Sequence, residues 1–147
     1  MNFQNQDDTN RNTITRSGAN LNSTYADDSG PGPEVMAADT LKGNDVVNAA
    51  GEDLGDIEAI MLDVQSGRVA YAVLSFGGFL GMGGKFFAIP WQALTLDTER
   101  KCFVLNIEKD RLDTAPGFDK DHWPSMADET WANSIHTYYG TDPYWRS

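Results

Sequence analysis

Apolar and polar residues alternate with a period of two along the middle of the chain, between residues 45 and 107. Side chains two residues apart lie on the same face of a strand, so this pattern predicts β-strands. Glycine and polar residues between the apolar runs predict tight turns, as at residues 65–67 and around Gly51 and Gly55, which are suited to positive φ. The predicted strands are residues 46–47, 57–64, 68–76, 86–90, 94–97 and 102–107.

The predicted strand at residues 68–76 is apolar on both faces. Tyr71 and Val73 share one face, and Ala72, Leu74 and Phe76 share the other. An antiparallel sheet with one solvated face would alternate more sharply. We therefore expect a mainly β fold, a small six-stranded antiparallel β-barrel with one face filling the lumen and the other covered from outside. The pattern does not decide what covers the outer face, which is either the C-terminal segment of the chain or a second subunit.

A C-terminal helix is predicted after Pro124. Residues 109–112 form a possible helical turn, and an extended strap carrying Phe118 and Trp123 follows it. Ser125 is the expected N-cap, and Gly140 is expected to end the helix. The apolar face of this amphipathic helix must be buried against something, and its large members are Trp131, Ile135 and Tyr138.

The N-terminal segment, residues 1–35, is rich in Asn, Asp, Thr, Ser and Gly, and its apolar residues follow no period. Such a segment buries too little apolar surface to offset its ordering entropy, so it is predicted to be a flexible, disordered polar tail. It is either a solvated leader or a segment that binds a partner. The predicted organisation is this tail, a barrel domain at residues 36–108, and a C-terminal strap and helix at residues 109–147.

The chain is acidic, with a formal net charge of -11 from 22 acidic and 11 basic side chains. This balance weighs against binding to nucleic acids or to anionic lipids. The N-terminus lacks the apolar core of a signal peptide, and no apolar run is long enough to cross a membrane. The single cysteine, Cys102, excludes an internal disulfide. We expect a cytoplasmic protein that neither binds nucleic acid nor inserts into a membrane.

The glycine-rich stretch "SFGGFLGMGGKFFAIPW", residues 75–91, does not fit a nucleotide-binding loop. A Walker loop ending in Gly84-Lys85 would need glycine at Phe79 and Ser or Thr at Phe86, and a dinucleotide fingerprint also fails at Phe86. Two interpretations of this loop remain. The loop connects two strands, and its tip residues Phe79, Leu80 and Met82 either fold over the barrel end or form a contact surface.

No catalytic or metal-binding constellation stands out from the sequence. Asp119, Asp121 and His122 are a conceivable metal site, although alternating acids in a loop are more often solvated charge. His136 is expected on the polar side of the helix, at the surface, and Cys102 is expected to be a partly buried thiol. The prediction is a protein that is not an enzyme and uses no cofactor or metal.

Residues 41–91 and the hairpin at residues 94–107 resemble the PRC-barrel domain. The resemblance is carried by Gly51 with Leu54-Gly55, by Asp63 with Gly67, and by "GGFLGMGGKFFAIPW". That domain is known from the H polypeptide of photosynthetic reaction centres, from the ribosome-maturation factor RimM and from stand-alone bacterial proteins. The resemblance implies a six-stranded antiparallel barrel and an adaptor or assembly role without catalytic machinery.

The expected function is therefore a protein-interaction module that associates with itself, as a homodimer or higher oligomer, and with a further protein. The predicted interaction surface combines the loop tip with the aromatic and apolar residues of the C-terminal segment: Phe79, Leu80, Met82, Trp123, Trp131, Ile135 and Tyr138. The alternative is a small-ligand or metal-binding protein related to stress response.

Overall fold

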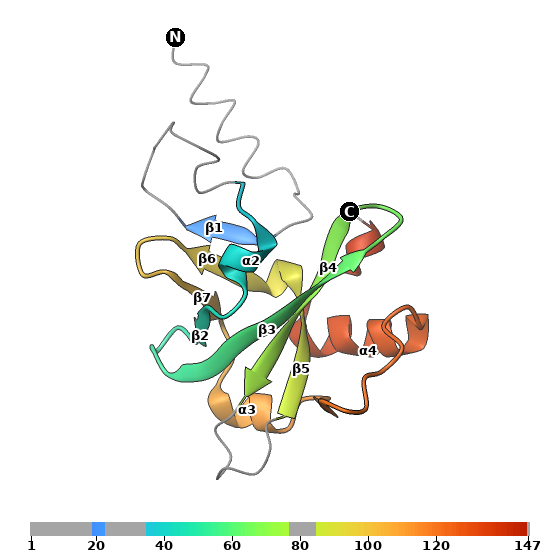
Figure 1. Ribbon diagram of the computed structural model, residues 1–147. Coiled ribbons are helices and arrows are strands. Elements are labelled where there is room, and N and C mark those ends of the chain that lie inside the picture. Colours follow the sequence, from blue (N-terminus) through green and yellow to red (C-terminus); the bar gives the residue numbers. More distant parts are fainter. Residues whose placement is uncertain (1–18, 23–34, 77–84, 147) are drawn as a thin grey trace.

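One eight-stranded sheet dominates the structure, a computed structural model that describes residues 19–22, 35–76 and 85–146 (Figure 1). The strands are β1 (Asn20–Asn22), β2 (Asp45–Val47), β3 (Asp53–Asp63), β4 (Arg68–Phe76), β5 (Lys85–Pro90), β6 (Leu94–Asp97), β7 (Cys102–Leu105) and β8 (Phe118–Asp119). The helices are α2 (Ala38–Leu41), α3 (Lys109–Asp113), α4 (Glu129–Tyr139), and the short 3-10 helices η1 (Trp91–Ala93) and η2 (Tyr144–Arg146). No helix of the described ranges is long and apolar enough to span a bilayer.

The sheet is mainly antiparallel but not entirely, and its strand order is β1-β6-β7-β2-β3-β4-β5-β8. β1 pairs with β6 and β2 pairs with β7 in parallel, which corrects the prediction of six antiparallel strands. Closure into a barrel is not confirmed either, since β1 and β8 stand at opposite ends of this order. β5 and β6 follow each other in sequence without pairing. Pro90, which has no N–H, ends β5, and η1 then turns the chain toward the other half of the sheet.

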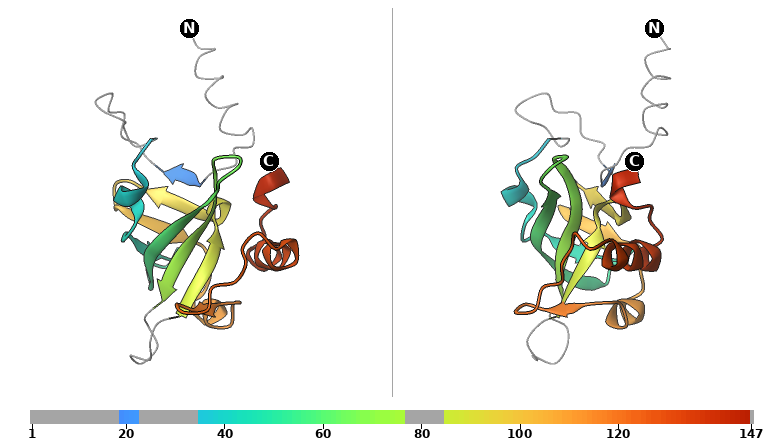
Figure 2. Two further views of the ribbon diagram at one scale, coloured as in Figure 1. Left: turned by 45° about the vertical axis from the view of Figure 1, so that its right-hand side comes forward. Right: turned by 90° about the vertical axis from the view of Figure 1, so that its right-hand side faces the viewer.

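The two halves of the open sheet share one apolar core. Figure 2 shows β3, β4 and β5 on one side of the molecule and β1, β6 and β7 on the other. Phe87 and Ile89 of β5, Leu94 of β6 and Phe103 of β7 belong to this core, and Leu112 of α3 adds to it. Burial of these side chains supplies the hydrophobic stabilisation that holds the two halves of the sheet together where β5 and β6 do not pair.

Two β-bulges shape the long β3–β4 hairpin. The register runs from Ile57 to Ala59 without a partner for Glu58, and from Tyr71 to Val69 without a partner for Ala70. Because Ala70 is the extra residue, Ala70 and Tyr71 are both buried against the outer apolar cluster although they are neighbours in sequence. The outer half of the hairpin extends past β2, which reaches only residues 53–56 of β3 (Figure 1).

The strands at residues 68–76 and 94–97 are confirmed as predicted, and the others differ at their ends. β3 begins at Asp53 rather than at residue 57, and β7 ends at Leu105 rather than at residue 107. β1, α2 and β8 were not predicted. β1 lies inside the predicted flexible tail, and most of the remainder of that tail lies outside the described residues.

The C-terminal elements occur where they were predicted, with one correction. The turn at residues 109–112 is α3, and Gly140 ends α4 with φ of 71°. The N-cap of α4 is Asp128, whose side chain accepts a hydrogen bond from the Thr130 N–H at 3.2 Å. The prediction of Ser125 was wrong, since its carbonyl instead accepts from the Asp128 N–H in a turn that precedes the helix.

Substituting Gly55 by alanine is expected to destabilise the fold strongly. Gly55 has φ of +131°, and a Cβ there would lie 2.1 Å from the Ser75 carbonyl oxygen. The backbone strain alone costs about 1–3 kcal/mol, and the clash with backbone adds to it. Gly67→Ala is the matched control, because Gly67 has φ of +77° with open space around its Cβ position. Equal losses in the free energy of unfolding, measured by urea denaturation, would contradict the argument.

Candidate interaction surfaces

Helix α4 covers the outer face of β4 and β5 (Figure 2). Ile135 is only 1% exposed and packs with Ala70, Tyr71 and Ala88. The Trp131 ring meets the Tyr71 ring edge-on, with 5.4 Å between their centroids. The cover of the second apolar face is therefore the C-terminal segment of the same chain. Ile135 is not accessible to a partner, although it was predicted to be part of an interaction surface.

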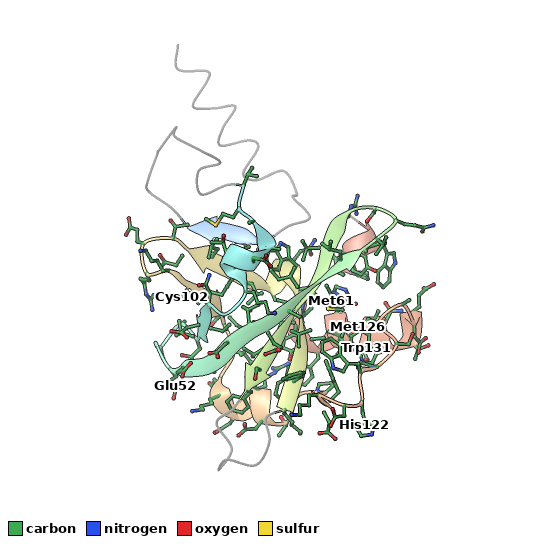
Figure 3. The ribbon with its side chains drawn as sticks, in the orientation of Figure 1. Glu52, Met61, Cys102, His122, Met126 and Trp131 are labelled. Carbon is green, nitrogen blue, oxygen red and sulfur yellow. The ribbon has the colours of Figure 1, made fainter. Side chains whose placement is uncertain are left out.

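Met61 of β3 and Met126, which precedes α4, extend this contact and lie close to Trp131 in Figure 3. Trp131 itself is only partly buried. The outer cluster therefore joins three parts of the chain, the hairpin, the strap and the helix. Burial of this cluster holds α4 on the sheet.

Tyr138 fastens α4 to α3. Its hydroxyl donates to the Arg111 carbonyl oxygen at 2.6 Å, while the Arg111 guanidinium donates to the Tyr138 carbonyl oxygen at 2.9 Å. The guanidinium carbon also lies 4.8 Å from the centre of the Tyr138 ring, a cation–π distance. This half-buried tyrosine is therefore bound to Arg111 of the same chain. Its position on an apolar helix face did not predict that contact.

His136 is buried, with 2% of its surface exposed, so the prediction that it lies at the surface was wrong. Its Nδ1 lies 2.8 Å from the Thr141 hydroxyl, and its Nε2 lies 3.5 Å from the Tyr71 hydroxyl. Rings of Tyr144 and Trp145 from η2 pack at 6.1 and 5.8 Å from it. Burial lowers the pKa of His136, and the Asp142 carboxylate opposes this shift.

An open groove of about 1200 Å³ lies where the β2–β3 turn, the end of η1, α3 and the end of α4 meet. Asn48 holds the turn rigid: its side-chain oxygen accepts from the Glu52 N–H at 2.9 Å, and its amide donates to the Glu52 carboxylate at 2.8 Å. Tyr139 also lines the groove, and its hydroxyl is buried without a hydrogen-bond partner. The sequence predicted a turn here but not the groove, because the four segments meet only in the fold.

Trp123 is the most accessible of the predicted surface residues that the structure describes. It is 41% exposed and packs against Phe86 and Phe118, with centroid distances of 5.9 and 5.1 Å. Its indole N–H donates to the Lys120 carbonyl oxygen at 2.7 Å, which fixes the ring on the strap. Phe79, Leu80 and Met82 lie outside the described residues.

The conceivable metal site on the strap is not assembled. His122 Nδ1 and Asp119 Oδ2 lie 3.8 Å apart, and both side chains are largely exposed (His122 is labelled in Figure 3). Within the described ranges, no group of three or more His, Cys, Asp or Glu side chains could hold a metal ion. Cys102 is buried, more fully than the partly buried thiol that was expected, and burial raises the pKa of its thiol.

Carboxylates gather on β2 and the first half of β3. Asp45 lies opposite Asp56 in the ladder, and Asp53 and Glu58 are close by. Partial burial, followed by repulsion from these three carboxylates, raises the pKa of Asp56. This part of the sheet therefore carries a concentrated negative charge.

Beyond this acidic row, β3 has an edge without a partner. The last contacts on that side are made by Ile57, whose N–H donates to the Asn44 carbonyl at 3.0 Å and whose carbonyl accepts from the Gly43 N–H at 2.8 Å. From Glu58 to Asp63, no described segment pairs with this side of β3. Leu62, 57% exposed, and Val64, 91% exposed, lie at this edge.

Truncation of Ile135 tests the docking of α4. Ile135→Ala is expected to lower the free energy of unfolding by about 2–5 kcal/mol, because it leaves a cavity between the helix and the sheet. Thr137→Ala, on the exposed side of α4, is the control and should change stability by no more than about 0.5 kcal/mol. Similar small effects of both substitutions in urea denaturation would show that the helix does not depend on this contact.

Protonation of His136 is expected to destabilise the fold in acid. Because its pKa is lower in the folded chain than in the unfolded one, the unfolded chain binds the proton first as the pH falls below about 6.5. The free energy of unfolding then decreases by at most about 1.4 kcal/mol per pH unit, until the folded-state pKa is passed. The measurement is urea denaturation between pH 8 and pH 5. His136→Gln should remove this part of the slope, and an unchanged slope would contradict the assignment.

Comparison with protein-family models identifies the family of the chain. The PRC-barrel domain model matches residues 33–112. None of the curated proteins matches the chain. Among solved structures, the chain is similar to a Pseudomonas aeruginosa protein named as a putative 16S ribosomal RNA processing protein, RimM, with 14% identity and a TM-score of 0.36. That similarity covers 58% of this chain and 50% of the other, so it spans half of the RimM chain. Since the domain model covers more than half of the sequence, the chain belongs to the PRC-barrel domain family.

Proposed function

We propose that the chain is a non-enzymatic protein-interaction and assembly module that associates with copies of itself. The observation that carries this proposal is the edge of β3 from Glu58 to Asp63, with which no described segment pairs, and the exposure of Leu62 and Val64 beside it. Unpaired backbone donors and acceptors on a strand edge are a template for pairing with another chain. Exposed apolar side chains at the same place favour such pairing, because contact removes them from water.

Two further features support an interaction role. Trp123 is held rigidly by Phe86 and Phe118 while a large part of its ring stays accessible, as in many recognition surfaces. The domain of about eighty residues that the family model matches is small, and a small domain buries a limited fraction of its surface on folding. Association would add stability to such a domain by mass action.

Self-association is expected to be reversible and weak, and sedimentation equilibrium tests it. Between about 1 and about 500 μM, the average mass should rise from that of a monomer toward that of a dimer, since a small interface commonly gives micromolar affinity. A constant monomer mass across this range would reject the proposed self-association. A mass that is already constant at a higher value would indicate a larger and tighter interface than this edge offers.

The groove beside α3 favours a second candidate function, the binding of a small ligand. It is large enough for a small molecule, and its walls combine apolar side chains with polar groups. Native mass spectrometry of freshly purified protein is the test. A stoichiometric added mass that disappears in an Asn106→Trp variant, which narrows the groove, would support this function. The bare mass of the chain would count against it.

A further inference from the structure

We infer that the unpaired edge of β3 is the seam of a symmetric dimer, in which β3 pairs antiparallel with β3 of a second copy. This inference rests on the self-association proposed above and names its surface, its geometry and its register. The occupant of the edge is a second copy of this chain.

The edge is long enough for pairing and lacks the usual protection. Residues 59–63 run without a bulge in β3, between the extra residue Glu58 and the turn that begins at Val64. Natural edge strands are commonly blocked by lysine, proline or a bulge within the edge. Residues 59–62, "AIML", contain no charged residue and no proline. The stretch therefore presents an accessible ladder with an apolar centre.

This stretch is complementary to itself. In an antiparallel pair related by a two-fold axis perpendicular to the sheet, opposed residues lie on the same face, so the axis passes midway between two copies of one residue. The register that pairs all of residues 59–63 places this axis at Met61 and sets Ile60 opposite Leu62 of the second copy. Two such apolar pairs form, one on each side of the axis, and Leu62 becomes buried.

The same register keeps like charges apart. Asp63 faces Ala59 of the second copy, and beyond the regular ladder Glu58 lies near Val64 of the second copy, so no two carboxylates are directly opposed. Two copies of this strand form the Ile60–Leu62 pair twice and separate their acidic side chains on both sides of the axis. A segment of different sequence has no such match with residues 59–63. The apolar pairs and the separated acids are the reasons for assigning the edge to a second copy.

Long-range charge acts against this dimer, which gives it a distinctive salt dependence. Each chain has a formal net charge of -11, and the acidic row at Asp45, Asp53 and Asp56 lies on the neighbouring part of the sheet. Salt screens repulsion between two such copies, so the dimer should tighten as sodium chloride is raised. A basic partner bound to the same acidic surface would instead dissociate.

The first experiment traps the seam in the full chain. A Met61→Cys variant, in which Cys102 is replaced by alanine, should form an intermolecular disulfide under mild oxidation. Opposed Cα atoms of antiparallel strands lie about 4.5–5.5 Å apart, within disulfide range. Asn133→Cys in the same background is the control, because Asn133 is exposed on α4 away from the seam. Equal cross-linking of both variants, or cross-linking of the control alone, would overturn the proposed seam.

The second experiment tests the register with substitutions at exposed positions that leave the core intact. Val64→Glu places a carboxylate near Glu58 of the second copy, at the end of the paired stretch, and should raise the dissociation constant by about tenfold or more. Adding Glu58→Lys to this variant turns repulsion into attraction and should restore the dimer. Trp123→Glu, at another exposed apolar site, should leave the dissociation constant unchanged.

The outcomes separate the seam from the broader proposal. A dimer that is insensitive to Val64→Glu but weakened by Trp123→Glu rejects the seam and keeps self-association. A chain that stays monomeric at all concentrations rejects both, and slow hydrogen exchange at residues 59–63 in that monomer would show that the chain itself covers the edge. Loss of the dimer with added salt would indicate that charge attraction, not strand pairing, joins the copies.

Discussion

β4 is buried on both of its faces, and the rest of the structure depends on covering it twice. On one face, Ala72, Leu74 and Phe76 belong to the core shared by the two halves of the sheet. On the other, Tyr71 belongs to the outer cluster under α4. The Ala70 bulge lets two successive residues bury on this outer side. A strand with this pattern cannot stand at the surface of a two-layer sheet, because one of its apolar faces would remain in water.

The second cover explains why the C-terminal third of the chain is built as it is. The strap brings α4 to the outer face of β4 and β5, and Tyr138 and Arg111 then fasten α4 to α3. His136 and η2 close the far end of the same contact, with the aromatic rings of Tyr144 and Trp145 against the imidazole. With α4 packed on the sheet, Ile135 is buried, while Trp131 and Tyr138 stay partly exposed. Among the described residues, the edge of β3 from Glu58 to Asp63 still combines backbone groups without a strand partner and exposed apolar side chains.

The errors of prediction have identifiable physical causes. His136 lies next to the Trp131–Ile135 stripe on α4, and a helical pattern alone cannot show that Tyr71 and η2 reach around that side to bury it. Ser125 and Asp128 are both residue types that favour the N-cap position. The helix begins after Asp128 because residues 125–128 form a turn, in which the Asp128 N–H donates to the Ser125 carbonyl oxygen. β1 has only three residues, two of them asparagine, and its strand conformation comes from pairing with β6 and not from its own propensity. Barrel closure was predicted because both faces of a strand are apolar. Closure also requires strands to pair in a matching register, and β5 and β6, which η1 separates, do not pair.

The sequence by itself determined the local elements and the need for two covers, because strand alternation, turn residues and helix stops act over a few neighbouring residues. Gly140 ends α4 and Pro90 ends β5 for reasons that are visible in the chain itself. Only the tertiary structure decided which elements cover the two faces of β4. Contacts such as Arg111 to Tyr138, or Tyr71 to His136, join residues 27 and 65 positions apart. Their energies depend on three-dimensional geometry, and no local pattern of apolar and polar residues records it.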